Sequence, residues 1–224
     1  MRWFTSDLHF GHSNIIKHAR RDRFLSREEF LALKEKDFQW EDKDPYKISK
    51  ESTDNMDEEI IHNINNLVSS DDILYFLGDF CRPGLSTKEA KKYRERIRCK
   101  TMHFVRGNHD KPGYDSIFST ADDVLVHELP QGMFFLSHYP HATWHRSHRG
   151  SFHLYGHEHA TFEDKMNHLF PKRRSMDVGV DNAAILLGTY RPFSVEEVVS
   201  ILLQRSAGAI YKTSKTEEEI LGDG

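Results

Sequence analysis

The stretch RWFTSDLH, residues 2–9, is a strand-like apolar run that leads directly into an aspartate and a histidine one residue apart. Alternate residues of an extended chain project to the same side, so Asp7 and His9 can reach one site together. Short apolar runs that end in turn residues recur along the chain and alternate with helical patterns. This alternation predicts an α/β fold.

The first half of the chain reads as strand, helix, strand, helix, strand. After the strand at 2–6 we expect a helix starting near 52–54, a strand at 73–77, a helix behind a capping box, and a strand at 102–105. The first helix turns one apolar face inward, formed by Met56, Ile60, Ile64 and Leu67. Ser86 and Glu89 form the capping box of the second.

Strands dominate the predicted second half. We expect them at residues 123–129, 133–137, 152–155 and 176–180. Only residues 194–203 are strongly helical, behind a Ser-x-x-Glu box formed by Ser194 and Glu197.

The length of 224 residues suits one domain, which we place at residues 1–204. Residues 20–52 are expected to form a polar insertion near the active site, where Ser26 and Glu29 can cap a short helix. This insertion either covers the site or decorates the surface. Residues 205–224 are weakly patterned, and we expect a C-terminal tail that frays or docks loosely.

Composition excludes several classes of protein. The net charge is −4 and the apolar fraction is ordinary, so neither disorder nor a polynucleotide-coating surface is indicated. Two cysteines are too few for a disulfide framework, and no CxxC zinc signature exists. The chain opens in a strand, without room for a signal peptide, and has no apolar run of membrane-spanning length. We therefore expect a cytoplasmic protein without a membrane partner.

Five of the predicted strands, those at 2–6, 73–77, 102–105, 133–137 and 152–155, deliver an oxygen or nitrogen ligand at their ends. The sequence blocks concerned are Asp7-x-His9, Gly78-Asp79, Gly107-Asn108-His109-Asp110, His138 and Gly156-His157-x-His159. Ligand-binding groups gather at the carboxyl ends of strands in α/β sheets, so these side chains can meet in one crevice. Each block is weak alone, because Asp-x-His can be a helix cap and Gly-Asp an ordinary turn. Their occurrence together, in this order, indicates a shared site.

The string of five blocks resembles the calcineurin-like metallophosphoesterase superfamily along nearly the whole chain. Within that superfamily, FTSDLHFGHSNII (residues 4–16), LSHYPH (136–141) and SMDVGVD (175–181) are most similar to the small bacterial and phage-type predicted phosphohydrolases. The resemblance implies a four-layer α-β-β-α sandwich of two mostly mixed β-sheets flanked by helices. It implies a hydrolase and names no substrate.

Carried over residue by residue, the resemblance implies two divalent metal ions that share Asp79. One ion would be held by Asp7, His9, Asp79 and His159, and the other by Asp79, Asn108, His138 and His157. Hard oxygens mixed with imidazoles suit Mn²⁺, which we expect first, or Fe²⁺, Zn²⁺ or Ni²⁺. Two ions roughly 3.5–4 Å apart can hold a bridging hydroxide for in-line attack on a phosphate ester.

The resemblance also implies that His109 is the catalytic acid for the leaving oxygen, and Asp110 beside it could orient the imidazole. Five more residues are candidates for contacts with substrate phosphate or base: Arg82, Arg106, His141, Arg146 and Arg149. Surface ion pairs are an equal alternative for Arg82 and Arg106, as are solvated side chains for the loop after His138. His153 is expected to satisfy a buried or second-layer hydrogen bond.

These observations predict a dinuclear metal-dependent phosphoesterase that hydrolyses a phosphomonoester or phosphodiester of a nucleotide or other small molecule. A nuclease or nucleic-acid end-processing enzyme is the nearest alternative. Basic clusters at 88–100, 145–149 and 172–174 favour it, whereas the balanced net charge and the lack of an aromatic–basic interleaved groove oppose it. A non-catalytic metal-stabilised scaffold is a third alternative, which the complete ligand set opposes. The oligomeric state stays open.

Overall fold

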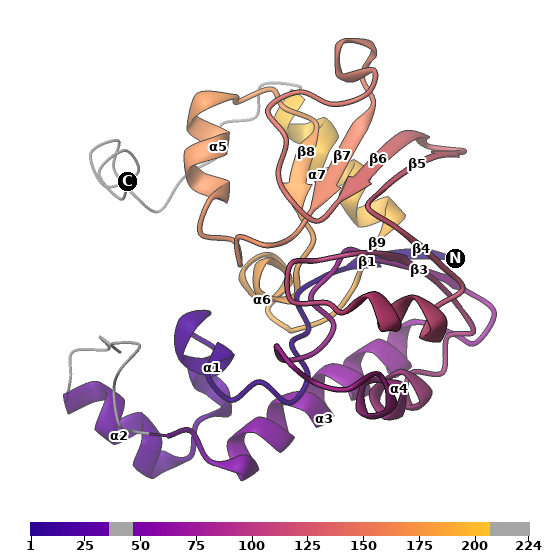
Figure 1. Cartoon of the computed structure of the whole chain (residues 1–224). Coiled ribbons are helices and arrows are strands. Elements are labelled where there is room, and N and C mark those ends of the chain that lie inside the picture. The colour runs from indigo at the N-terminus through magenta and orange to yellow at the C-terminus, as the bar shows by residue number, and fades with distance from the viewer. Residues whose placement is uncertain (36–46, 207–224) are drawn as a thin grey trace.

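The computed structural model describes residues 1–35 and 47–206 of the chain. Within them, two β-sheets lie face to face and helices cover their outer sides (Figure 1). The first sheet has the strand order β4-β3-β2-β1-β9, and the second has the order β5-β6-β7-β8. This is the predicted α/β architecture of two mixed sheets flanked by helices.

The first sheet is parallel except at one edge. Its strands are β1 (Arg2–Thr5), β2 (Ile73–Phe76), β3 (Thr101–Val105), β4 (Thr120–Asp122) and β9 (Phe193–Ser194), of which β9 alone runs antiparallel to its neighbour. The predicted strands at 2–6, 73–77 and 102–105 are confirmed to within one residue at each end. The short edge strands β4 and β9 were not predicted, because two or three residues carry no readable period.

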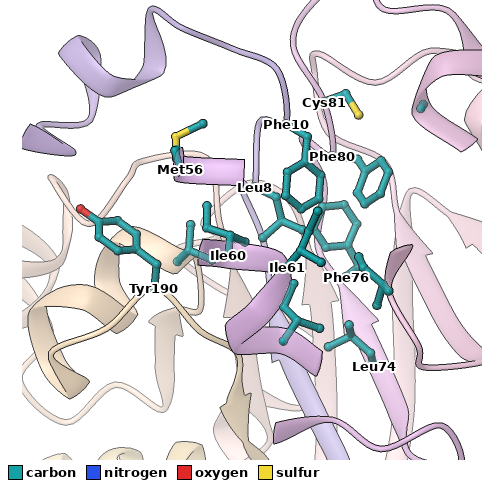
Figure 2. Packing of buried hydrophobic residues seen from close by; sticks show 14 of the residues in the cluster. Leu8, Phe10, Met56, Ile60, Ile61, Leu74, Phe76, Phe80, Cys81 and Tyr190 are labelled. Carbon is teal, nitrogen blue, oxygen red and sulfur yellow. The ribbon is translucent and has the colours of Figure 1, made fainter. Parts of the chain in front are cut away.

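Side-chain alternation along β2 divides the core into two halves. Leu74 and Phe76 point to the side covered by helices α3 (Lys50–Leu67) and α4 (Thr87–Arg96), whereas Tyr75 and Leu77 face the second sheet. Figure 2 shows the helix-covered half, where Ile60 of α3 packs toward the same cluster. Met56, Ile60 and Ile64 are buried as predicted, while Leu67 at the end of α3 is 39% exposed.

The second sheet consists of β5 (Val124–Leu129), β6 (Gly132–Ser137), β7 (Phe152–Tyr155) and β8 (Ser175–Asp177). The β5 and β6 strands form an antiparallel hairpin, and β7 and β8 then add in parallel. The inner face packs against the first sheet through stacked aromatic rings, with Phe134 lying 5.5 Å from Phe4 between ring centroids. Strand register therefore places alternate residues of β6 and β7 in the core between the sheets.

Helices in the second half are more numerous than predicted. The structure has α5 (Glu163–Leu169), α6 (Val180–Leu187) and α7 (Val195–Ser206), of which the sequence predicted only α7 with its Ser194–Glu197 box. The expected strand at 176–180 is correspondingly wrong at its end, because extended Gly179 caps α6 and the helix starts at Val180. A short apolar run such as VDNAAILL cannot be assigned to strand or helix from its period.

The segment 20–52 belongs partly to the core. It contains η1 (Asp22–Phe24) and α2 (Arg27–Glu35), and α2 begins behind the predicted Ser26–Glu29 box. The carboxylate of Glu29 also accepts the backbone N–H of Ser49, the residue that caps α3, at 2.6 Å. Phe24, Leu33 and Ile48 are buried. The rest of the expected insertion, residues 36–46, and the tail from residue 207 lie outside the described residues.

Parallel strands bring the chain segments of the candidate site to one edge. The segments that follow β1 and β2 stay paired, with the backbone N–H of Asp7 donating to the Gly78 carbonyl at 2.9 Å and that of His9 to the Asp79 carbonyl at 3.0 Å. In the second sheet, Gly156 donates to the His138 carbonyl at 2.9 Å. Short helices α1 (Ile15–His18), η2 (Pro112–Ile117) and η3 (Ser147–Arg149) complete the described fold. None of its described helices has the length and apolar character needed to cross a membrane.

Candidate metal centre

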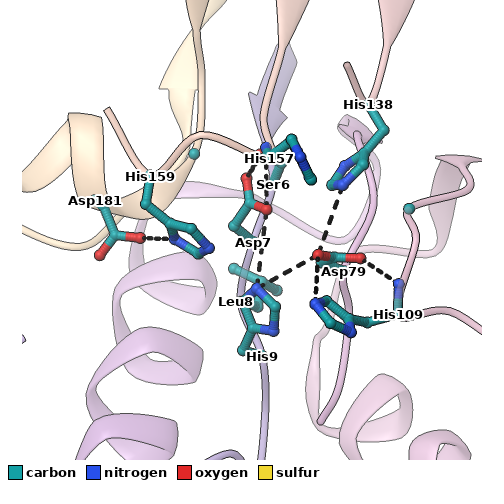
Figure 3. A network of polar contacts seen from close by, with 12 residues as sticks. Ser6, Asp7, Leu8, His9, Asp79, His109, His138, His157, His159 and Asp181 are labelled. Carbon is teal, nitrogen blue, oxygen red and sulfur yellow. Dashed lines mark hydrogen bonds and ion pairs between the residues drawn. The ribbon is translucent and has the colours of Figure 1, made fainter. Parts of the chain in front are cut away.

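All seven predicted metal ligands meet where the two sheets present the ends of their strands. Figure 3 labels them apart from Asn108, which its contacts with His138 and His157 place beside the others. Each ligand lies within four residues of the end of a strand, as the sequence predicted. The strands that supply them are β1, β2, β3, β6 and β7, which carry Asp7 and His9, Asp79, Asn108, His138, and His157 and His159.

The ligands form two clusters that share one carboxylate. Ligating atoms of Asp7, His9 and His159 lie within 4.8 Å of one another, and so do those of Asp79, His138 and His157. The Asp79 Oδ2 atom is 3.5 Å from His9 Nε2 and 3.6 Å from His138 Nε2. Asn108 joins the second cluster, because its Oδ1 lies 2.9 Å from His138 Nε2 and 2.9 Å from His157 Nδ1. Asp79 therefore stands between the clusters.

The backbone of the site is held in an unfavourable conformation. Five of the seven residues have left-handed φ angles, namely Asp7 (57°), His9 (52°), Asp79 (60°), His157 (74°) and His159 (47°). Such a conformation costs a non-glycine residue roughly 1–2 kcal/mol and persists only where surrounding structure enforces it. Glycine provides the necessary room at Gly78 (φ 97°), where a Cβ atom would lie 2.5 Å from His138 Nδ1. Local strain concentrated on five ligands indicates a functional site.

Imidazole lone pairs converge with oxygens at this site, which is the arrangement that a cation needs. His138 Nδ1 lies 2.7 Å from the Leu77 carbonyl and must donate to it, so Nε2 carries the lone pair toward Asn108 Oδ1. Both ring nitrogens of His9, which is 1% exposed, have no hydrogen-bond partner among the described residues. A bound divalent ion would give these atoms a partner, and the donor set of carboxylate, amide oxygen and imidazole fits such an ion.

Burial lowers the pKa of two imidazoles at this site, those of His9 and His157. Burial, together with the charges of Arg21 and neighbouring histidines, holds the pKa of His9 well below its usual range. Burial and His138 likewise lower the pKa of His157. Burial raises the pKa of Asp79, and Asp7 adds to the rise against the opposing effect of His138. Lowered pKa values at His9 and His157, beside closely spaced buried carboxylates, suit metal binding, which requires unprotonated ligands. At His159, burial is outweighed by the hydrogen bond to Asp181, which raises the pKa of the ring.

Two residues that the sequence did not single out support the first cluster. Arg21, fully buried, donates to both oxygens of Asp181 at 2.8 and 2.9 Å, and to the backbone carbonyls of Asp7 at 2.7 Å and Leu8 at 3.2 Å. Asp181 Oδ2 lies 2.7 Å from His159 Nδ1, which leaves His159 Nε2 for the cluster. Asp177 similarly fixes the following turn by accepting the backbone N–H of Ala160 at 2.9 Å.

His109 lies at the mouth of the site. Its backbone N–H donates to Asp79 Oδ1 at 2.9 Å, and its ring Nε2 is 3.9 Å from Asp79 Oδ2. The side chain is 37% exposed, so it can face an entering substrate. His12, which the sequence did not single out, has its ring 5.5 Å from that of His9 between centroids. Burial first, and the charge of His109 second, lower the pKa of His12 to about 4.

Asp110 has other partners than the imidazole we expected it to orient. Its carboxylate accepts three backbone N–H groups, from Asp79 at 2.7 Å, Gly107 at 2.8 Å and Phe80 at 2.9 Å. Within the described residues it makes no hydrogen bond to the His109 ring. Because these donors belong to the segments after β2 and β3, the Asp110 carboxylate links the two loops.

The structure gives different surroundings to Arg106 and Arg82, two of the candidate substrate contacts. Arg106 makes a bidentate ion pair with Asp115 at 2.7 and 2.9 Å and a further one with Asp123 at 2.9 Å, which is the ion-pair alternative. Arg82 is exposed and contacts the Pro83 carbonyl at 3.4 Å.

His141 lies away from the clusters, on the outer face of the second sheet. Its backbone N–H donates to His153 Nε2 at 3.0 Å, and its ring is 5.3 Å from that of Phe135. His153 is fully buried and also contacts the Phe135 carbonyl at 3.1 Å, which confirms the buried hydrogen bond expected for it.

Arg146 and Arg149, expected to contact substrate, lie at the wrong end of the second sheet for that role. Because β6 and β7 are parallel, the connection after His138 must run back along the sheet before β7 can start. Both arginines border a hollow that Gly132 and Phe152 also line, at the starts of β6 and β7. The ligands follow the opposite ends of these strands, about 20 Å away for a six-residue strand.

Comparison with known proteins agrees with the geometry. A family model described as calcineurin-like phosphoesterase matches residues 2–175. An uncharacterized protein of Methanocaldococcus jannaschii is 31% identical over 202 residues, which cover 89% of this chain and 90% of the relative. The crystal structure of a protein of unknown function from Aquifex aeolicus shares the fold, with a TM-score of 0.58 at 19% identity over 90% of this chain and 98% of that one. The chain belongs to the calcineurin-like phosphoesterase family.

Proposed function

We propose that this protein is a dinuclear metal-dependent phosphoesterase that hydrolyses a phosphomonoester or phosphodiester of a small, nucleotide-like substrate. The observation that supports it best is the position of Asp79 Oδ2, 3.5 Å from His9 Nε2 in one cluster and 3.6 Å from His138 Nε2 in the other. A single carboxylate oxygen between two sets of ligands is the arrangement that a two-metal site needs.

Each of the two clusters would hold one ion. Asp7, His9, Asp79 and His159 would hold one, and Asp79, Asn108, His138 and His157 the other, with Mn²⁺ as the first candidate and Fe²⁺, Zn²⁺ or Ni²⁺ as alternatives. When bound, such ions supply Lewis acidity toward phosphoryl oxygens and lower the pKa of water toward neutrality.

His109 is our candidate for the general acid. Asp79 links His109 to the two clusters. Its Oδ1 accepts the His109 backbone N–H, and its Oδ2 lies between the clusters. This hydrogen bond positions the His109 backbone beside the ligands, and the partly exposed ring also reaches solvent. From this position its imidazole would donate a proton to the leaving oxygen of a phosphate ester. Asp110 would contribute by holding the loop that carries His109.

Activity measurements test this proposal. Purified protein, stripped with EDTA and reloaded with Mn²⁺, should hydrolyse p-nitrophenyl phosphate, its bis-ester or 2′,3′-cyclic nucleotides. His109→Gln should reduce kcat by 10²–10⁴-fold, the usual contribution of a general acid, as an order-of-magnitude estimate. His168→Gln, at an exposed histidine of α5, is the matched control and should leave kcat unchanged. Failure to turn over any of these substrates with any of the four metals, or full activity of Asp79→Asn, would overturn the proposal.

A further inference from the structure

Two hollows flank one ridge on the second sheet, at the end far from the metal ligands. We define the basic ridge as residues 146–150 together with Arg173 and Arg174. The first hollow, of about 360 Å³, is lined by Arg146, Arg149 and Arg174 above Phe152, Val199 and Leu203. The second, of about 530 Å³, is lined by Trp144, His148, Met166, Leu169, Phe170 and Lys172. Since Arg173 borders the second hollow and Arg174 the first, the hollows lie on opposite sides of the ridge.

The first hollow carries an excess of positive charge. Among the residues that the structure describes, no carboxylate forms an ion pair with Arg146, Arg149 or Arg174. Glu128 is the acidic residue among those that line the hollow, so three arginines line it with one glutamate. Arg173, by contrast, is buried and forms an ion pair with Glu163 at 2.9 Å. Guanidinium groups without a carboxylate partner keep their donors for phosphate oxygens.

One of the three arginines, Arg174, is held in place by its contacts. Arg174 donates through Nη1 to the Gly150 carbonyl at 2.9 Å, and its guanidinium lies 5.6 Å from the centre of the Phe152 ring. Gly150 has φ 83°, a backbone conformation that favours glycine, and a Cβ atom there would lie 2.7 Å from that Nη1. Arg146 itself adopts a left-handed φ of 58°. An arginine held in a conformation that disfavours every side chain points to a use for that side chain.

The second hollow adds aromatic surface to the cations. Phe170 is 46% exposed and Leu169 is 50% exposed, and Lys172 borders the same hollow. The Trp144 ring is held by a hydrogen bond from its Nε1 to Ser151 Oγ at 3.0 Å. A positively charged groove beside fixed aromatic rings is how proteins bind single-stranded nucleic acid, because bases stack on the rings while phosphates contact the cations.

We propose that the basic ridge and its two hollows bind single-stranded nucleic acid, with phosphates in the first hollow and a base against Phe170 in the second. This surface is assembled from the turn before β6, the loop before β7 and the segment after α5, which are distant in sequence. It therefore brings basic and aromatic side chains together in a way that no single stretch of sequence displays. It lies at the opposite end of β6 and β7 from the metal ligands, so the proposal does not depend on the phosphoesterase activity.

Fluorescence anisotropy with the full-length protein in EDTA tests the proposal. The probes are a labelled oligo-dT strand, a duplex of the same length, and inorganic polyphosphate as competitor. We expect salt-sensitive binding of the single strand. In Arg146→Ala/Arg149→Ala/Arg174→Ala, affinity should fall at least about tenfold, and the slope of log K against log salt should fall by about 2, for three phosphate contacts. Lys88→Ala/Lys91→Ala/Lys92→Ala removes the same charge from α4 and should bind like the unmodified protein.

A second set of variants separates stacking from charge. Phe170→Ala should weaken oligo-dT binding on the order of tenfold and leave competition by polyphosphate unchanged, whereas Ile185→Ala, at a side chain 71% exposed, should change neither. If the triple arginine variant does not fold, Arg146→Ala/Arg149→Ala replaces it, because neither side chain makes a hydrogen bond within the described residues.

Four results would each overturn the proposal. The first is no binding of the single strand at low salt, and the second is an equal loss of affinity in the arginine and lysine triple variants. The third is equal affinity for the duplex and the single strand. The fourth is polyphosphate binding as tight as oligo-dT binding, together with no effect of Phe170→Ala on oligo-dT affinity. Each can be observed whether or not the protein hydrolyses any phosphate ester, so failure here is distinct from failure of the proposed activity.

Discussion

Arg21 and Asp181 are joined by two hydrogen bonds of 2.8 and 2.9 Å across 160 residues of sequence. The same guanidinium holds the carbonyls of Asp7 and Leu8, and the same carboxylate accepts from His159 Nδ1. Chain segments from both sheets, which each carry a ligand of the first cluster, are therefore tied to one buried ion pair. That ion pair explains how left-handed backbone at Asp7, His9 and His159 is maintained.

Removal of Arg21 should strongly destabilise the fold. Arg21→Ala leaves the Asp181 carboxylate buried without its cation, and it frees two backbone carbonyls. We expect a loss of about 3–5 kcal/mol in the free energy of unfolding, measured by urea denaturation in EDTA. Arg23→Ala is the matched control, because Arg23 pairs with Glu59 at the surface and should contribute less than about 1 kcal/mol. Similar losses in both variants would contradict the supporting role of Arg21.

Removal of the Asp181 charge should weaken one metal site and spare the other. In Asp181→Asn a neutral amide with one acceptor oxygen replaces the charged carboxylate that fixes the His159 ring, so affinity of the first cluster for Mn²⁺ should fall about 10–100-fold. Isothermal titration calorimetry should then show one weakened site and one unchanged site. Asp123→Asn, at an exposed carboxylate, should show two unchanged sites. Equal weakening of both sites by Asp181→Asn would argue against the division of ligands described above.

Substitutions at Asp110 and His109 should affect the stability of the fold differently. Asp110→Asn replaces one acceptor oxygen with an NH₂ group among three backbone donors, so we expect a loss of about 2–3 kcal/mol in the free energy of unfolding without metal. His109→Ala changes a half-exposed ring and should cost less than about 1 kcal/mol, although it removes the proposed acid. Urea denaturation in EDTA checks both. The prediction fails if Asp110→Asn is as stable as the unmodified protein.

His153 should make the fold sensitive to acid. Burial, and then His141, lower the pKa of His153 from its ordinary value of 6.5 to about 3, against the opposing hydrogen bond to the Phe135 carbonyl. The unfolded chain therefore binds the proton first, so stability present above pH 6.5 is lost as the pH falls toward 3. Between pH 7 and 4.5 this loss is at most about 3 kcal/mol.

His153→Gln isolates that contribution. The glutamine side chain can accept from the His141 N–H and donate to the Phe135 carbonyl without titrating. Unfolding free energies at pH 7 and 4.5 should differ less in the variant than in the unmodified protein. An equal difference in both would show that His153 does not titrate across this range.

The features that could be predicted from the sequence are those that depend on a local pattern of residues. The ligand blocks come directly after runs of alternating or continuous apolar residues, so both the strands and the positions of Asp7, Asp79 and His138 at their ends were readable. Capping boxes at Ser86 and Ser194 marked two helices for the same reason. The α6 helix was missed because eight mostly apolar residues have no distinctive period.

Contacts between distant segments could not be predicted in this way. Nothing near Arg21 indicates Asp181, and a polar residue in a charge-rich segment is ordinarily expected at the surface. The loop with Arg146 and Arg149 was assigned to the site because it starts at a ligand. Its direction depends on β7 being parallel to β6, which is a property of the sheet and not of the loop sequence.

The central claim is that two cations share Asp79. Anomalous diffraction from crystals of the protein soaked in Mn²⁺ measures this directly, at the wavelength of the manganese edge. We predict two peaks in each molecule, one beside Asp7, His9 and His159 and the other beside Asn108, His138 and His157, with the Asp79 carboxylate between them. A single peak that leaves either cluster without manganese, or no peak near Asp79, would contradict the account.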